Sequence, residues 1–285
     1  MKLIFCKDGK DFLDRFEAAL LSQEVVHQLI LGNAAAQLDT PLNVACFFGA
    51  VLREDDSPII VFNRRDPFRL LIDPVDTAAP DIQEAVTLLA QHVVDKKMDI
   101  PGVLASQSIC DAFLSVDTGN TYKQGHGMDI MELREITPHP LSPGNFRLAE
   151  EKDIPQLVDW YIAFHEEALG NTLTAEEALP KITPRMATKD FYVYENSEGK
   201  PVTMAGVSRR LRLGCCVSNV YTPPEERGKG YCASLMQLLA EERLAAGNTY
   251  LGLYVDKANP ISNHVYKKIG YRILVDSFEY DRITE

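Results

Sequence analysis

The sequence lacks several features that would assign it at once to a common class of protein. It contains no run of about eighteen apolar residues, so we expect no membrane-spanning helix. The segment Met1–Asp8 turns polar too early for a secretory signal peptide. The six cysteines form no CxxC pair, which argues against a zinc site and against a disulfide framework. These absences predict a protein of the reducing cytoplasm with no bound metal.

Basic residues are also scarce, with 29 lysines and arginines against 41 aspartates and glutamates, a net charge of -12. This balance disfavours non-specific binding to nucleic acid or to an anionic membrane. It is compatible with a cationic partner, although solubility alone accounts for it. The 285 residues are 46% apolar and 25% charged, which is the composition of a globular protein with room for two domains.

A linker is expected over residues 137–145, which contain three prolines and one glycine. We therefore predict an N-terminal domain over residues 1–140 and a second domain over residues 146–285. In the second domain, helices are predicted over 153–170, 174–179, 231–246 and 259–269, and strands over 146–148, 191–194, 202–210, 212–222, 249–255 and 271–281. This order predicts an α/β fold with a mixed sheet flanked by helices.

The first half repeats this order more loosely. Helical segments are predicted over 11–38, 81–95 and 106–116, and strands over 44–51, 58–62, 69–72, 102–105 and 128–135. Between a strand and the following helix, residues 73–80 contain no glycine and two aspartates, so an anionic ligand would be poorly received there. We interpret the first half as a degenerate copy of the second; an unrelated α/β domain is the alternative.

The second half contains a glycine loop between a strand and a helix. An apolar stretch ends at Thr222, two prolines follow, and residues 227–230 contain two glycines and two basic side chains. The next segment has an apolar stripe formed by Cys232, Leu235, Met236 and Leu239. Glycines allow a tight turn, and a helix N-terminus attracts anions, so the order predicts a phosphate-binding loop. A simple surface turn is the alternative.

A second motif runs from Asn259 to Tyr271. Asn259, Asn263 and Tyr266 fall on one face of the predicted helix, whereas Ile261, Val265 and Ile269 fall on another that would pack on the sheet. Asn259 suits the helix cap. A tyrosine held by a packed helix can donate a proton to a leaving group, because its reference pKa is about 10. The alternative is that Tyr266 only fills space beside the sheet.

Together the two motifs resemble those of the GNAT superfamily of acetyl-CoA-dependent N-acetyltransferases, over about Phe146 to Ile283. The segment Arg227–Cys232 resembles the family's loop, Gln/Arg-x-x-Gly-x-Gly/Ala, with Cys232 in place of the last small residue. The family's later pattern is matched by Asn259, Tyr266, Gly270 and Tyr271. The first half looks like the degenerate N-terminal domain of some two-domain members.

The resemblance implies direct transfer of an acetyl group from acetyl-CoA, the co-substrate, to an amine in a ternary complex. Tyr266 would protonate the departing sulfur. It also implies the groups that bind acetyl-CoA: the strand end for the pantetheine arm, the loop and first helical turn for the pyrophosphate, and an asparagine for the arm. These residues are Val220, Tyr221, Thr222, Arg227, Gly228, Lys229, Gly230, Tyr231, Cys232, Ala233 and Asn259.

A base is useful because the attacking amine must be neutral. Glu166 and Glu167, with His165 beside them, are the candidates, and the alternative is that they are solvated helix charges. Cys215 and Cys216 fit strand packing better than nucleophilic roles. The acceptor is expected to be a small-molecule amine or a protein amine. A binding or regulatory module that responds to CoA without turnover is the second functional hypothesis, and transfer of a longer acyl chain is the third.

Overall fold

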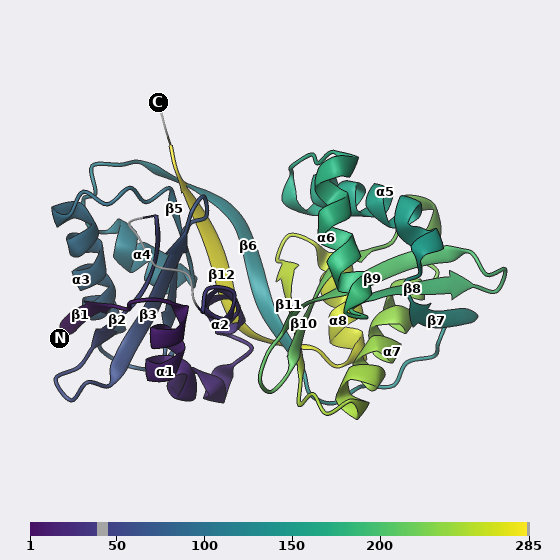
Figure 1. Cartoon of the computed structure of the whole chain (residues 1–285), viewed down its shortest axis with the longest axis horizontal. Helices are drawn as coiled ribbons and strands as arrows, with labels where there is room; N and C mark the ends of the chain where they lie inside the picture. Colours follow the sequence, from purple (N-terminus) through teal and green to yellow (C-terminus); the bar gives the residue numbers. More distant parts are fainter. Residues whose placement is uncertain (39–44, 284–285) are drawn as a thin grey trace. The chain divides into compact units, whose positions relative to one another are not determined.

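The computed structural model describes residues 1–38 and 45–283, and it divides into two compact units (Figure 1). The first unit comprises Met1–Ile130 and Leu274–Glu285, and the second comprises Met131–Ile273. Each unit contains a mixed β-sheet with helices on both faces. The α/β fold class predicted from the sequence is therefore confirmed.

The first unit is built from strands and helices that alternate along the chain. Its strands are β1 (Lys2–Phe5), β2 (Cys46–Leu52), β3 (Pro58–Arg65), β4 (Leu70–Pro74), β5 (Gly102–Ala105), β6 (Tyr122–Leu133) and β12 (Arg272–Arg282). Its helices are α1 (Gly9–Leu20), α2 (Gln28–Ala35), α3 (Ile82–Asp95) and α4 (Gln107–Leu114), with a 3-10 turn at Leu21–Gln23. The strand order is β1-β2-β3-β4-β5-β12-β6, and β4 and β5 run parallel.

Alternation of side chains along β2 explains why helices cover both faces of this sheet. Phe47 belongs to an apolar cluster that includes Leu89 of α3 and Phe113 of α4. Its neighbour Phe48 points to the opposite face, where its ring lies 5.1 Å from that of Phe12 in α1. A strand with both faces buried reads as a continuous apolar run, which is what the sequence of β2 shows.

The second unit repeats this plan. Its strands are β7 (Gly144–Leu148), β8 (Phe191–Asn196), β9 (Pro201–Arg210), β10 (Cys215–Tyr221) and β11 (Leu251–Asp256). Its helices are α5 (Ile154–Phe164), α6 (Ala175–Ala187), α7 (Tyr231–Ala245) and α8 (Pro260–Ile269), with one π-helical turn at His165–Leu169 and 3-10 turns at Glu151–Asp153 and Pro224–Glu226. The order is β11-β10-β9-β8-β7, and β10 and β11 run parallel.

The faces of β8 show how the helices of the second unit are held. Tyr192 and Tyr194 belong to an apolar cluster that includes residues of α7 and α8. Phe191 and Val193 belong to a second cluster, which contains residues of α5 and α6. The pairs α5/α6 and α7/α8 therefore cover opposite faces of the sheet (Figure 1).

Two local predictions are wrong. The helix expected to stop at Pro180 continues as α6 to Ala187, because Ala178 and Ile182 are buried on its inner face and offset the backbone bonds that the prolines remove. Ile261 does not pack on the sheet: it is 75% exposed, whereas Tyr266 and Ile269 form the buried face of α8. The strand predicted over 44–51 corresponds to β2, which begins at Cys46; residue 44 lies outside the described residues.

Two strands, β6 and β12, begin in one unit and end in the other, which we call strand exchange. β6 follows α4, yet its final residues Met131 and Leu133 pack in the core of the second unit. β12 follows α8, yet it pairs antiparallel with β5 from Phe278 to Asp281 in the first unit. The expected second domain ran to residue 285, whereas the residues from Leu274 onward group with the first unit.

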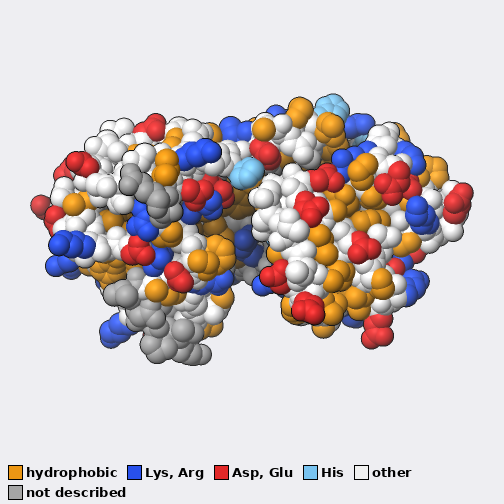
Figure 2. All heavy atoms as spheres, turned by 90° about the horizontal axis from the view of Figure 1, so that it is seen from above, with side chains coloured by type: hydrophobic (Ala, Val, Ile, Leu, Met, Phe, Trp, Pro, Cys, Tyr) orange, Lys and Arg blue, Asp and Glu red, His pale blue; other side chains and the backbone are white. Residues whose placement is uncertain are grey.

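The surface is mixed in charge. Figure 2 shows acidic and basic side chains interspersed over the visible face, with no broad basic field. Of the helices in the described ranges, none is both long enough and apolar enough to span a bilayer.

Candidate active site

The site begins where β10 separates from β11. The parallel ladder joins Cys215 to Leu251 and Cys216 to Gly252, and it ends there although β10 continues to Tyr221. The register of β10 against β9 also shifts along this stretch, and Asn219 adopts a left-handed conformation with φ 54°. The edge of β10 beyond Cys216 is therefore open toward a ligand that can hydrogen-bond to a strand.

The loop after β10 presents a row of backbone donors. Gly228 and Gly230 have φ of 76° and 81°, which L-residues rarely adopt, and Gly230 leads directly into α7. In the described parts of the chain, no acceptor hydrogen-bonds to the N–H groups of residues 228–233. A Cβ built on Gly228 would meet nothing within 4 Å, so the space above it is open. The loop and the first turn of α7 can therefore surround an anion with N–H groups.

The basic side chains of the loop are already paired. Lys229 Nζ lies 2.8 Å from Glu226 Oε2, and Lys200 Nζ lies 3.3 Å from the other oxygen of this carboxylate. The hydrogen bond from Lys229 is the main cause that holds the pKa of Glu226 below its usual value. The charge of Lys229 is therefore partly neutralised by Glu226, and the donors of the loop without a partner among the described residues are backbone N–H groups.

Arg227, Tyr221 and Glu167 form a second cluster at the end of β10. Arg227 donates from Nε to the Thr222 carbonyl at 2.8 Å and from Nη2 to Glu167 Oε2 at 2.6 Å. The Tyr221 hydroxyl donates to Glu167 Oε1 at 2.9 Å. Burial, with a smaller effect of this bond to Glu167, raises the pKa of Tyr221 to about 12. Glu166 is exposed and makes no polar contact within the described ranges.

The carbonyl groups at the end of β10 are partly engaged by the protein. The Tyr221 carbonyl accepts from Thr203 Oγ1 at 2.8 Å, and that of Thr222 accepts from Arg227. The ladder to β11 does not reach Val220.

Tyr266 lies where α8 meets the first turn of α7. Its side chain is 7% exposed, and its ring lies 5.7 Å from that of Tyr271. Burial, with a smaller contribution from nearby Cys232, raises the pKa of Tyr266 well above its usual value. Burial also raises the pKa of the Cys232 thiol to about 12. At neutral pH, Tyr266 is therefore a protonated hydroxyl, and Cys232 is not a thiolate.

Asn259 caps α8 and helps to tie it to β11. Its Oδ1 accepts from the Ser262 N–H at 3.0 Å, which satisfies one free donor of the first turn. Asn263 Nδ2 donates to the carbonyl of Asp256, the last residue of β11, at 2.8 Å and to that of Asn259 at 2.9 Å. These bonds fix the start of the helix that carries Tyr266.

Three further residues with reactive or titratable side chains lie on the elements that carry the site. Cys215 and Cys216 are buried in β10, as strand packing requires, and burial raises the pKa of Cys215 to about 11. His264 is exposed on α8. Sequence reasoning missed Asn219, because nothing in a single sequence marks a bulge at an asparagine inside an apolar strand.

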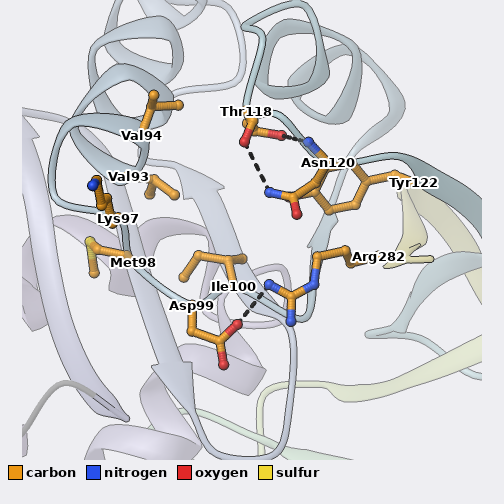
Figure 3. A pocket seen from close by; sticks show the side chains of 10 residues that line it. All are labelled: Val93, Val94, Lys97, Met98, Asp99, Ile100, Thr118, Asn120, Tyr122 and Arg282. Carbon is orange, nitrogen blue, oxygen red and sulfur yellow. Dashed lines mark hydrogen bonds and ion pairs between the residues drawn. The ribbon is translucent and has the colours of Figure 1, made fainter. Parts of the chain in front are cut away.

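A separate hollow of about 290 Å³ lies within the first unit (Figure 3). Its lining comes from α3, the segment after it, the start of β6 and the end of β12, with an ion pair between Asp99 and Arg282 at 2.6 Å. It contains none of the predicted site residues.

The open edge of β10, the N–H row and the buried Tyr266 all belong to the second unit, and the first turn of α7 borders both the row and the tyrosine. Residues 154–271 match the model of the acetyltransferase (GNAT) family. The chain therefore carries a GNAT acetyltransferase domain, as the resemblance predicted, behind an N-terminal half built on the same plan.

Solved structures share this fold over most of the chain. A GNAT-family acetyltransferase from Colwellia psychrerythraea aligns over 100% of both chains with a TM-score of 0.58 and 10% identity. A GCN5-related N-acetyltransferase from Sphaerobacter thermophilus covers 84% of this chain and 81% of its own, with a TM-score of 0.57 and 15% identity. A Drosophila protein covers 99% and 98%, with a TM-score of 0.61 and 12% identity. No curated protein matches the sequence.

Proposed function

We propose that the protein transfers an acetyl group from acetyl-CoA to the nitrogen of an amine. The observation that carries this proposal is the row of unpaired N–H groups at residues 228–233, placed at the start of α7 and beside the open edge of β10. These N–H groups would hold the pyrophosphate, since charge-assisted bonds to backbone donors are strong. The backbone of Val220–Thr222 would bind the pantetheine arm, with the Asn259 amide as a further contact. Acetyl-CoA supplies an activated thioester.

The reaction needs no covalent enzyme intermediate. The neutral amine nitrogen attacks the thioester carbonyl carbon, so that a C–N bond forms and the C–S bond breaks. Tyr266 gives its hydroxyl proton to the departing sulfur and regains a proton that the amine has released. Holding the two reactants in line supplies the larger share of the rate, and proton transfer adds about 10²- to 10⁴-fold.

The acceptor side offers three candidates for the group that takes the amine proton. Glu167 accepts hydrogen bonds on both oxygens, from Tyr221 and Arg227, so protonation would disrupt that cluster. His165 Nδ1 lies 3.1 Å from Asn171 Oδ1; with Nδ1 as the donor, Nε2 keeps its lone pair. Burial is the main cause that lowers the pKa of His165, which keeps the ring neutral near pH 7. We therefore favour His165 over Glu167 and the exposed Glu166.

The test is an acceptor screen with purified protein. Acetyl-CoA is mixed with small-molecule amines and with peptides that bear free amines, and released thiol is measured. Acetyl-CoA binding is measured in parallel by calorimetry. Thiol release that depends on an amine supports the proposal. Binding without turnover across the panel would instead favour a CoA-responsive regulatory module, and better use of longer acyl-CoAs would indicate a different acyl group. The six cysteines, which form no CxxC pair, favour the reducing cytoplasm as the location of the protein.

A further inference from the structure

Arg185, a half-buried arginine of the second unit, has no carboxylate partner among the described residues. Arg53, Arg147 and Arg243 are half-buried, and each forms an ion pair at 2.6 to 3.0 Å. Arg185 of α6 is also half-buried, yet within the described ranges it forms no ion pair. Removing a charge from water is costly unless a partner compensates, so an unpaired guanidinium in this position calls for a functional reason.

The structure holds this guanidinium in place with neutral groups. Arg185 donates from Nη1 to Asn219 Oδ1, and Ser218 Oγ lies 3.0 Å from the same oxygen. Asn219 is 5% exposed and sits in the left-handed position of β10. Gly206 of β9 lies beside this guanidinium: a Cβ built on it would be in ordinary contact with Arg185 Nη1, at 3.6 Å. The bond to Asn219 uses Nη1 and leaves Nε and Nη2 for a ligand.

The position of Arg185 is on the acceptor side of the proposed reaction. Asn219 lies on β10 beyond the end of the ladder to β11, two residues before Tyr221. Arg185 also acts electrostatically on His165, the favoured proton acceptor. Burial lowers the pKa of Arg185 and the positive charge of Arg209 adds to this, while Tyr161 and Asp190 oppose it. The cost that an incoming anion would offset is therefore mainly that of burying the guanidinium.

We propose that the acceptor amine also carries a carboxylate, and that Arg185 binds this carboxylate. The inference rests on the proposed acetyl transfer, because it assigns the acceptor of that reaction. The planar guanidinium can meet both carboxylate oxygens through Nε and Nη2. The bond to Asn219 fixes its orientation. A free amino acid, or another aminocarboxylate, fits this arrangement better than the purely cationic amine that the net charge of the chain suggested.

The test compares common amino acids with their carboxamides, which keep the amine and lose the charge. In the wild-type protein, kcat/KM should be higher for the acids. Arg185→Gln should lower kcat/KM for the acids about 100-fold and leave the carboxamides and acetyl-CoA affinity nearly unchanged. Arg185→Lys, which keeps the charge without the fork, should fall between. Arg272→Gln, at an exposed arginine of β12, is the matched control and should change neither class.

A binding measurement keeps this inference separable from the proposed function. Thermal stabilisation by each acid and its carboxamide is measured with CoA present, in wild type and in Arg185→Gln, after circular dichroism has confirmed folding. Stabilisation specific to the acids that disappears in Arg185→Gln supports the carboxylate site even if no acetyl transfer occurs. Equal use or binding of acids and carboxamides by the wild type overturns it, as does an equal loss of both classes in Arg185→Gln.

Discussion

The connection from β4 to α3 in the first unit and that from β10 to α7 in the second occupy the same place in the repeated order of elements, but their backbone donors are used differently. In the first unit, Asp76 Oδ1 accepts from the Ala78 N–H at 2.9 Å, and Asp81, beside the first turn of α3, pairs with Arg53 at 2.6 Å. Carboxylates of the chain therefore occupy the positive end of α3. In the second unit, the N–H groups of residues 228–233 have no acceptor among the described residues.

The helix that carries the proposed general acid, α8, also differs from α4, the helix at the same place in the first unit. In the second unit, Asn259 is the residue before α8, and Tyr266 lies seven positions after Asn259. In the first unit, Ser106 is the residue before α4, and Phe113 lies seven positions after Ser106. Phe113 is buried like Tyr266 but has no hydroxyl. Both units nevertheless keep a two-pair parallel ladder, β4 with β5 and β10 with β11. The two units thus share their architecture, whereas the buried tyrosine hydroxyl at this position is found in the second unit.

The largest effect should come from removing the part of β12 that belongs to the first unit. Ending the chain at Ile273 deletes the part of β12 that pairs with β5, including Asp281, which binds Arg69 at 2.8 Å. We expect the melting temperature of the first unit to fall by about 10 °C or more, because an edge and an apolar cluster lose their cover. Calorimetry measures this; a chain ending at Ile283 is the control, and an unchanged transition would contradict the strand exchange.

Tyr266→Phe should lower kcat about 100-fold or more while leaving the Kd for acetyl-CoA within about twofold, because the variant loses a proton donor and no binding group. Steady-state kinetics and calorimetry measure the two quantities. Tyr271→Phe is the matched control, since the Tyr271 hydroxyl is buried without a partner among the described residues and should be dispensable. Equal turnover in wild type and Tyr266→Phe would remove this tyrosine from the mechanism.

Gly228→Val should weaken acetyl-CoA binding about tenfold. A β-branched residue at φ 76° costs roughly 1–2 kcal/mol, and the loop can relieve this strain only by turning its N–H groups away. Gly199→Val is a close control, because Gly199 has the same φ of 76° and equally open space in the turn between β8 and β9. Both variants should lose similar stability. If binding also falls equally, the glycine loop has no special part in holding the ligand.

The site was predictable from sequence where it is local. A glycine with positive φ, an asparagine cap and a tyrosine two turns later all leave their mark within about ten residues. The pairing of Arg227 with Glu167 was not predictable, because the two residues are 60 positions apart in the sequence and meet only when the loop packs on a neighbouring element. Asn219 belongs to the same group.

The fold shows the same division between local and long-range features. The element order and the mixed sheet followed from periodicity and turn residues. The exchange of β6 and β12 depends on strand pairing over a long sequence separation, as in Phe278 with Ala105, which no local pattern encodes. The helix across Pro180 is a third case, because burial of Ile182 overrides the local preference of proline.

The smallest effect concerns pH and tests the environment of Tyr266. Because burial raises the pKa of Tyr266, this hydroxyl keeps its proton to higher pH than an ordinary tyrosine, whose pKa is about 10. Loss of the Tyr266 proton therefore cannot limit the reaction below about pH 10. The value of kcat/KM should therefore rise as His165 and the acceptor amine lose their protons, and it should show no decline below about pH 10. The profile of Tyr266→Phe should have the same shape at a lower level. An alkaline decline below pH 10 in wild type, absent from Tyr266→Phe, would mean that burial does not protect this hydroxyl, and that its environment resembles solvent rather than the apolar one of Phe113.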